Sequence, residues 1–237
     1  MTEQETLRAN VESIRARMAD AARAAGRRPD EVLLCAASKT RSAETVRLAA
    51  SLPIDLFGEN RVQELVEKQA ANAYAPKPAH FIGHLQTNKV KQVVGCDLIQ
   101  SVDSEHLLSK IAAEAQRRGL AQPILLEVNI GGEESKSGIE PGALWALLEA
   151  AAAQPSVQVR GLMTIPPVEE QPGEARRWFA AMRRLFDEAA DRWKGDSRVR
   201  MEMLSMGMSG DFEQAIAEGA TLVRVGTAIF GPRVYKV

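Results

Sequence analysis

Short apolar runs and longer amphipathic stretches alternate along most of the chain. Each run has the length of a buried strand, and the runs predicted as strands are 33–39, 55–58, 80–83, 97–101, 124–130, 157–163, 201–204 and 221–225. The stretches between them repeat apolar residues in steps of three and four, which predicts helices at 43–51, 61–71, 87–94, 104–118, 143–152, 173–193 and 211–218. A further amphipathic helix at 3–25 precedes the first strand, and Gly26 and Pro29 are its stop signals.

The regular alternation of strand and helix predicts the fold class. Such a pattern is typical of parallel strands joined by right-handed crossovers. Eight units in 237 residues match a closed (β/α)8 TIM barrel with an extra N-terminal helix. An open, doubly wound sheet is the alternative, but the glycine-rich dinucleotide fingerprint is missing after the first strand. No low-complexity linker interrupts the chain, so we expect one domain over 1–237.

Composition and charge narrow the class of partner. The net charge of −1 gives no global attraction to nucleic acid or to an acidic membrane. No apolar run approaches the length of a membrane span, and the polar, acidic N-terminus is unlike a signal peptide. The two cysteines, Cys35 and Cys96, lie in apolar strand-like runs, which argues against a disulfide framework. These features predict a cytoplasmic protein.

A lysine at the end of the first strand is the first candidate for chemistry. Side chains alternate along a strand, so Leu33, Cys35, Ala37 and Lys39 share one face. The small residues near its end leave room beside the amine. Lys39 either extends to water or serves a reaction, and its position taken alone favours the solvated lysine that strand ends often carry.

The loops after the last two strands favour a phosphate site. The segment 205–210 is small, hydroxylated and glycine-bearing, and Gly226-Thr227 has the same character after the final strand. Backbone N–H groups at such turns, together with hydroxyls, bind phosphate, and barrels commonly use these two loops for it. The alternative is that Ser209 only caps a helix, with Asp211 in its first turn.

Barrel closure would bring these candidates together, because the first and last strands become neighbours. Lys39 beside a phosphate site, with neither a metal nor a dinucleotide motif, suggests a Schiff base. The lysine must be neutral to react, so its pKa has to fall from about 10.4. Arg224 could lower it, because alternation along its strand places it on the face of Leu222 and Gly226, pointing into the barrel.

Seven motifs, in order, resemble those of the pyridoxal phosphate homeostasis proteins. They are Ala-Ala-Ser-Lys-Thr (36–40), Phe-Gly-Glu-Asn-Arg-Val-Gln-Glu (57–64), His-Phe-Ile-Gly-His-Leu-Gln-Thr-Asn-Lys (80–89), Ser-Lys-Ser-Gly (135–138), Arg-Gly-Leu-Met-Thr-Ile (160–165), Leu-Ser-Met-Gly-Met-Ser (204–209) and Arg-Val-Gly-Thr-Ala-Ile-Phe-Gly (224–231). A series of this length is far more specific than any single pattern.

The resemblance implies a barrel related to the N-terminal domain of alanine racemase, the type III fold of pyridoxal phosphate (PLP) proteins. It implies PLP held covalently as a Schiff base on Lys39, with Arg224 facing the pyridine nitrogen. The residues expected around the phosphate are Ser205, Gly207, Ser209, Gly226 and Thr227, and those expected to line the ring are Asn60, His84 and Met163.

Two features favour a carrier of PLP over an enzyme. An arginine cannot accept a proton from the pyridine nitrogen, so the ring would be a weaker electron sink than with a carboxylate partner. The second domain of the racemases, which lends a catalytic tyrosine across a dimer, has no counterpart, and neither Tyr74 nor Tyr235 can be placed as an acid or base. We therefore expect a monomeric protein of vitamin B6 homeostasis without robust turnover, which carries or buffers PLP or hands it over to apo-enzymes.

Two other functions remain alternatives. An amino-acid racemase of the same barrel type would racemise free amino acids, and a phosphosugar isomerase without PLP would be colourless. Lys136 in the loop after the fifth strand, and Lys236 in the tail, are further candidate amines. No metal site is expected, because His80 and His84 on an extended strand lie about 13 Å apart.

Overall fold

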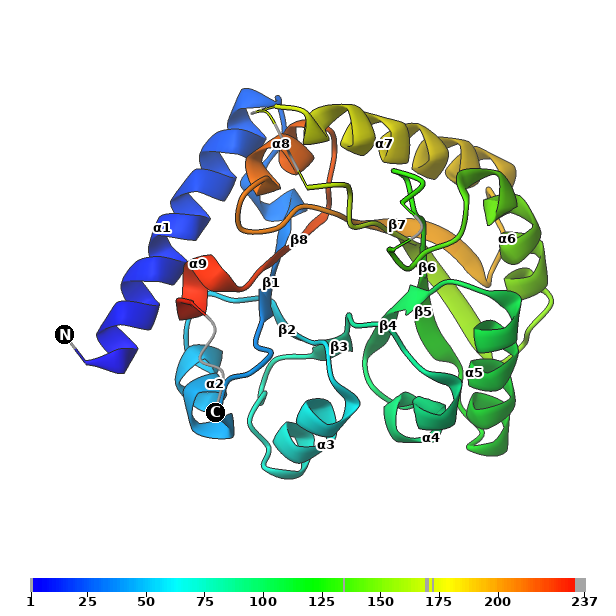
Figure 1. Ribbon diagram of the computed structural model, residues 1–237, viewed down its shortest axis with the longest axis horizontal. Coiled ribbons are helices and arrows are strands. Elements are labelled where there is room, and N and C mark those ends of the chain that lie inside the picture. The colour runs from blue at the N-terminus through cyan, green and yellow to red at the C-terminus, as the bar shows by residue number, and fades with distance from the viewer. Residues whose placement is uncertain (1, 134, 169–170, 172, 233–237) are drawn as a thin grey trace.

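Eight parallel strands close into a barrel in which each strand pairs with its neighbours in sequence, and β1 pairs with β8. The computed structural model describes residues 2–133, 135–168, 171 and 173–232. The strands are β1 (Leu33–Ala37), β2 (Leu56–Glu59), β3 (Ala79–Phe81), β4 (Leu98–Val102), β5 (Gln122–Glu127), β6 (Val157–Met163), β7 (Val199–Ser205) and β8 (Leu222–Val225). The helices are α1 (Glu3–Ala24), α2 (Ala43–Ala50), α3 (Val62–Ala70), α4 (Val90–Val93), α5 (Glu105–Arg117), α6 (Leu144–Ala152), α7 (Ala175–Arg192), α8 (Phe212–Ala217) and α9 (Thr227–Phe230). Figure 1 looks down the ring of strands, with the helices arranged around it. The predicted (β/α)8 barrel is confirmed.

The extra N-terminal helix is confirmed as well, and its start follows from a capping box. The Thr2 hydroxyl accepts the Glu5 N–H at 3.2 Å, and the Glu5 carboxylate accepts the Thr2 N–H at 2.8 Å. The buried stripe of this helix consists of Leu7, Val11, Ile14, Met18 and Ala22. It packs against α8 and α9, which flank β8 in sequence, so α1 lies beside the closure of the barrel (Figure 1).

Several predicted elements differ in extent from the observed ones. The strand predicted at 124–130 is observed as β5, which begins two residues earlier and ends at Glu127. The segment 87–94, predicted as one helix, is a 3₁₀ turn followed by the single turn α4. No side chain caps this helix, and Val90, Val93 and Val94 are β-branched residues of low helix propensity. Strand β7 begins at Val199, whereas the prediction began at 201, because exposed Arg200 breaks the apolar run on which the prediction was based.

Side chains alternate between the outer core and the barrel interior. In β8, Val223 and Val225 belong to the large core beneath the helices, whereas Leu222 joins Cys35 in a small inner cluster. Arg224 takes the next inward position and is only 4 % exposed. The predicted inward direction of Arg224 is therefore confirmed.

Strand β1 ends earlier than its apolar run suggested. It stops at Ala37, although the Ser38 N–H still donates to the Gly58 carbonyl of β2 at 3.0 Å. Thr40 then has a φ of 64°, a left-handed conformation that turns the chain away from the strand direction. Lys39 therefore lies in a turn at the carboxyl rim of the barrel, not inside the strand.

Strand β6 carries a bulge where it pairs with β7. The register shifts between Val159 and Gly161, and Gly161 has a φ of 145°. A Cβ atom at this position would lie 1.9 Å from the Met203 carbonyl oxygen. Glycine is therefore required here for β6 and β7 to pair closely.

Candidate functional site

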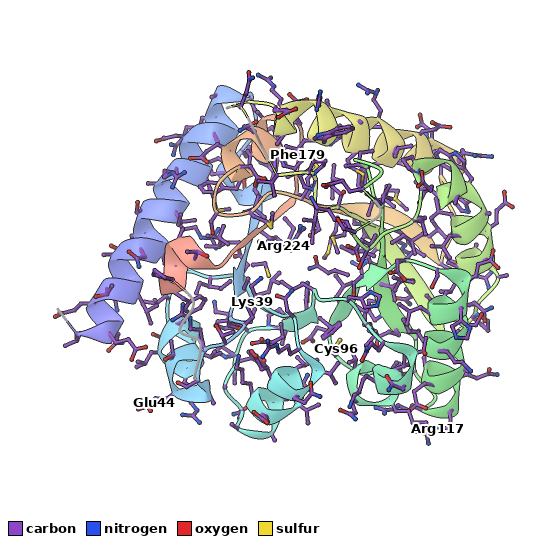
Figure 2. The ribbon with its side chains drawn as sticks, in the orientation of Figure 1. Lys39, Glu44, Cys96, Arg117, Phe179 and Arg224 are labelled. Carbon is purple, nitrogen blue, oxygen red and sulfur yellow. The ribbon has the colours of Figure 1, made fainter. Side chains whose placement is uncertain are left out.

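A pocket of about 230 Å³ opens at the carboxyl rim of the barrel, where the ends of β1 and β8 meet. Its lining residues come from several strand ends and are Ala37, Lys39, Asn60, Ile82, Ile165, Met208, Ser209, Gly210, Arg224, Gly226 and Thr227. In Figure 2, Lys39 and Arg224 lie within the ring of strands, whereas Glu44 and Arg117 lie on the outer helices. Barrel closure thus joins residues from the two ends of the chain in one site.

Arg224 is the buried cation of this pocket. Its guanidinium donates to the Ser205 hydroxyl at 2.6 Å and to the Thr164 carbonyl at 2.8 Å. The Ser205 hydroxyl in turn donates to the Gln100 side-chain oxygen at 2.7 Å. Arginine carries more N–H donors than these bonds use, so the group keeps donors for a ligand.

The charges around Arg224 oppose the effect of its burial. Burial lowers the pKa of the Arg224 guanidinium, while Cys35, Glu127 and Asp211 act to raise it. Glu127 ends β5 and is itself buried, and this burial raises the pKa of its carboxyl to about 7. Asp103 adds to the rise in the pKa of Glu127, and Arg224 counters it.

The loops after β7 and β8 meet through Ser209. Its hydroxyl accepts the backbone N–H groups of Gly226 and Ala228, each at 3.3 Å. Gly207 makes the sharp turn before Ser209, with a φ of 94°, and a Cβ there would lie 2.6 Å from the Ala215 Cβ. These contacts fix a small polar cradle beside Thr227, where backbone N–H groups point at an oxygen atom.

Asn60 supplies an acceptor that the protein leaves unsatisfied. Its side-chain oxygen is buried and has no hydrogen-bond partner among the described residues, yet the residue lines the pocket. Buried polar atoms are normally paired, so an orphaned one inside a pocket marks a place where a ligand can donate. A ligand hydroxyl would satisfy it.

The structure places Lys39, Asn60, Ser209, Arg224, Gly226 and Thr227 of the predicted site residues in the pocket lining. The other four lie elsewhere. Met163 packs in the barrel interior against Leu98 and Leu125, and Ser205 is the buried bridge between Arg224 and Gln100. Gly207 accepts the Arg224 backbone N–H through its carbonyl at 2.9 Å.

His84 lies on the outer part of the rim. Its side chain is 59 % exposed, and its Nδ1 atom lies 3.2 Å from the Ser137 hydroxyl and 3.5 Å from the Asp103 carboxylate. Contacts of His84, Met163, Ser205 and Gly207 with a cofactor stay predictions.

Sequence reasoning missed the polar residues inside the barrel. Glu127 lies within the predicted strand 124–130, and an acidic residue inside an apolar run indicates a buried polar site. Gln100 and His80 lie deeper, with the Gln100 amide nitrogen 2.9 Å from His80 Nδ1. Burial lowers the pKa of His80 to about 4, so this ring is neutral near pH 7.

The secondary candidates lie away from the pocket lining. Lys136 donates to the Pro166 carbonyl at 2.7 Å and pairs with Glu133 at 2.6 Å. Tyr74 is buried and donates to Glu59 at 3.2 Å. Tyr235 and Lys236 lie outside the described residues. Within the described part of the chain, no cluster of three or more potential metal ligands occurs.

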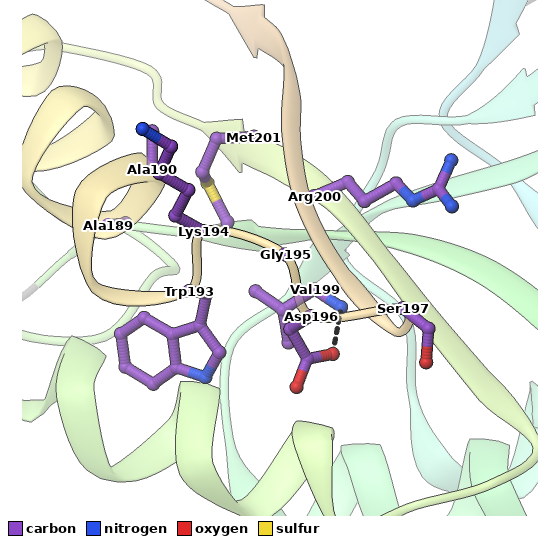
Figure 3. Close-up of a pocket in the computed structure, with 10 residues that line it drawn as sticks. All are labelled: Ala189, Ala190, Trp193, Lys194, Gly195, Asp196, Ser197, Val199, Arg200 and Met201. Atoms are coloured by element: carbon purple, nitrogen blue, oxygen red, sulfur yellow. Dashed lines mark hydrogen bonds between the residues drawn. The ribbon is translucent and has the colours of Figure 1, made fainter.

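A larger cavity, of about 480 Å³, lies between α7 and the start of β7 (Figure 3). It is at the amino-terminal end of the strand, away from the rim that carries function in barrels of this class. The Asp196 carboxylate in it accepts the N–H groups of Arg198 and Val199, at 2.7 and 3.0 Å. This carboxylate shapes the turn into β7, and the rim pocket remains the candidate site.

Among the helices that the structure describes, none combines the length and the apolar character that a membrane span requires.

Comparison with known proteins gives both a family and a fold. Residues 4–234 match the family described as "Alanine racemase, N-terminal domain". A "Pyridoxal phosphate homeostasis protein" of Aquifex aeolicus is 44% identical over 220 residues, covering 92% of this chain and 95% of the relative.

Solved structures agree with this result. PipY of Synechococcus elongatus, solved with PLP bound, is 37% identical, has a TM-score of 0.76, and the match covers 90% of this chain and 100% of PipY. Alanine racemase of Streptomyces lavendulae is 20% identical, with a TM-score of 0.77 and coverage of 96% of this chain and 57% of the racemase. The racemase likeness concerns the fold alone.

Proposed function

Because this chain belongs to the family of the pyridoxal phosphate homeostasis proteins, we propose that it binds PLP in the rim pocket and acts in PLP homeostasis. We further propose that PLP is held covalently, as a Schiff base on Lys39. The observation that supports this most directly is that Lys39, Arg224 and the Ser209 cradle line one pocket. When bound, the cofactor would supply an aldehyde that reacts with amines and a ring that withdraws electrons.

The pocket fits a small phosphorylated ring. Its volume of about 230 Å³ is below the roughly 300–1,000 Å³ of pockets for drug-sized ligands. The unsatisfied Asn60 oxygen would accept a hydroxyl, and the spare N–H donors of Arg224 would face a ring nitrogen. The hydroxyls of Ser209 and Thr227 would donate to the phosphate at this cradle, where the Gly226 N–H orients the Ser209 oxygen.

Lys39 would be the covalent anchor because it lines the pocket together with a buried cation. An amine is nucleophilic only in its neutral form, and a neighbouring positive charge favours that form. Arg224 lines the same pocket, and its hydrogen bonds to Ser205 and Thr164 hold it in place.

The chemistry of the lining favours a carrier over a racemase. Inversion at a carbon requires proton transfer on both of its faces. Apart from Lys39, the described residues that line the pocket include no carboxylate, imidazole, phenol or thiol. Arg224 also cannot take a proton from the pyridine nitrogen. We therefore propose a protein without robust turnover, which passes PLP to apo-enzymes.

We propose that the protein works in the cytoplasm, as a monomer of one domain. Its two described thiols, Cys35 and Cys96, are buried and unpaired, as suits a reducing compartment. Among the described residues, Val66 and Val168 are the only large apolar side chains that are exposed. The described surface therefore has no broad apolar face of the kind that binds a second protein chain.

The test combines a visible spectrum with borohydride reduction and peptide mapping of the purified protein. We expect a yellow protein whose reduced adduct maps to Lys39, and Lys39→Arg should abolish the colour. Lys136→Arg is the matched control and should retain it. A colourless protein that takes up no added PLP would overturn the proposal, and an adduct on Lys136 would overturn the anchor. Racemisation of free amino acids at protein concentrations far below substrate would favour the enzyme.

A further inference from the structure

A buried ion-pair network contacts the residues on both sides of Lys39 and lies outside the pocket lining. Its centre is the Lys68 ammonium of α3, whose side chain is only 5% exposed. This group donates to the Ser38 carbonyl at 2.8 Å and to the Glu59 carboxylate at 2.7 Å, and lies 3.4 Å from the Glu64 carboxylate. Three acceptors surround an ammonium that has three N–H donors, so its charge is fully partnered.

Glu59 ties this network to the residue before Lys39. One of its carboxylate oxygens accepts the hydroxyls of Ser38 at 2.6 Å and Tyr74 at 3.2 Å, in addition to the Lys68 ammonium. Its side chain is fully buried. Ser38 is therefore held through both its carbonyl and its hydroxyl.

Glu64 ties the network to the residue after Lys39. Its carboxylate accepts the Thr40 N–H at 2.7 Å and also contacts Lys68. Thr40 is β-branched and has a φ of 64°, a conformation that such residues avoid unless their surroundings hold them there. Its hydroxyl is buried without a partner among the described residues. The chain thus keeps an unfavourable backbone geometry at the position next to Lys39.

We propose that Lys68, Glu59 and Glu64 are positioning residues for Lys39, acting through the backbone on both of its sides. Clamping Ser38 and Thr40 restricts the direction in which the Lys39 side chain leaves the rim and brings its amine into the pocket in one orientation. A network that only fastened α3 to the barrel would not need contacts on both neighbours of the lysine. The assignment of a role toward PLP rests on the proposed function.

Glu64 is the best position for a test. It is partly exposed, so its loss leaves less of a buried vacancy than the loss of Lys68 or Glu59. Glu64→Ala removes the acceptor for the Thr40 N–H, whereas Glu64→Gln keeps a side-chain oxygen there. Glu67→Ala, on the exposed face of the same helix, is the matched control.

The first readout needs no cofactor. Lysines of the cofactor-free protein are labelled with ¹³C-methyl groups, and the Lys39 signal is identified by its loss in Lys39→Arg. We expect one displaced, narrow Lys39 signal in the wild type, in Glu64→Gln and in Glu67→Ala. In Glu64→Ala it should move toward the averaged position of exposed lysines, and a signal unchanged in Glu64→Ala would overturn the proposal.

The second readout is the rate at which added PLP is captured on Lys39, followed by absorbance and verified by borohydride mapping. Glu64→Ala should slow capture by about 10- to 100-fold, a typical penalty for a reacting group that has lost its orientation. Glu64→Gln should stay within about threefold of the wild type. Equal capture rates in Glu64→Ala and the wild type would overturn the positioning role. Failure of every variant, wild type included, to capture PLP would instead overturn the proposed function, while the methyl signal would still decide the orientation of Lys39.

Discussion

Replacing Glu127 by glutamine should stabilise the protein at alkaline pH and change little at acidic pH. Glu127 lies inside the barrel with 4 % of its surface exposed, and its burial and Asp103 together raise the pKa of the carboxyl to about 7, against the opposing charge of Arg224. Glutamine has nearly the same shape and no charge. The substitution therefore removes an ionisation that the folded state disfavours.

The sign and size of the effect follow from the two pKa values. Below pH 4.5, the ordinary value, the carboxyl is protonated in both the folded and the unfolded chain, and no penalty exists. As the pH rises from 4.5 to about 7, the unfolded chain loses this proton first, so the free energy of unfolding falls. The difference between about 7 and 4.5, at about 1.36 kcal/mol per pH unit, corresponds to about 3 kcal/mol above pH 7.

Urea denaturation of wild type and variant at pH 5 and pH 8 measures this difference. At pH 8 the variant should be more stable by about 3 kcal/mol, with a melting temperature higher by roughly 6–12 °C. Glu149→Gln, on the exposed side of α6, is the control and should change stability by less than about 0.5 kcal/mol. A Glu127→Gln variant with the same advantage at both pH values would refute the reasoning, because the buried carboxyl would then ionise without cost.

Three further substitutions test other parts of the structure. Ser209→Ala should weaken PLP binding by about tenfold in a fluorescence titration, since the cradle loses its hydroxyl, and unchanged affinity would exclude this serine from the phosphate site. Gly161→Ala should cost about 3 kcal/mol or more in urea denaturation, because its Cβ would lie 1.9 Å from the Met203 oxygen; a neutral effect would contradict the bulge geometry. Lys68→Met should cost about 3–5 kcal/mol by leaving the Glu59 carboxylate buried without its cation, and near-wild-type stability would mean that Glu59 is not charged there.

The barrel was predictable because the apolar repeat that indicates each helix or strand lies within the residues of that element. Steps of three and four marked the helices, and short apolar runs marked the strands. The alternation within β8 was sufficient to turn Arg224 inward, since Val223 and Val225 had to face the helices. Closure of the barrel then placed Lys39 beside the loops after β7 and β8.

The polar contacts inside the barrel could not be predicted from the local sequence pattern. In sequence, Ser205 belongs to a segment predicted as a hydroxylated loop, but the structure extends β7 through this residue. Because side chains alternate along a strand, this extension determines whether the Ser205 hydroxyl faces the barrel interior or the outer core. Its hydroxyl bridges Gln100 and Arg224, so the contact joins residues from three different strands. Lys68 reads in sequence as an ordinary surface lysine of a helix, and only the fold shows that it is buried. Such contacts depend on which strand ends meet, and no periodicity encodes that.

The pairing of β1 with β8 also has a consequence for how the protein is made. Lys39 leaves the ribosome before Ser209, Arg224 and Thr227, which emerge on the order of ten to forty seconds later at 5–20 residues per second. The pocket does not exist during that interval. Capture of the cofactor in it would therefore report that the last strand has closed the ring, and a stalled or incomplete chain would carry the lysine without the site.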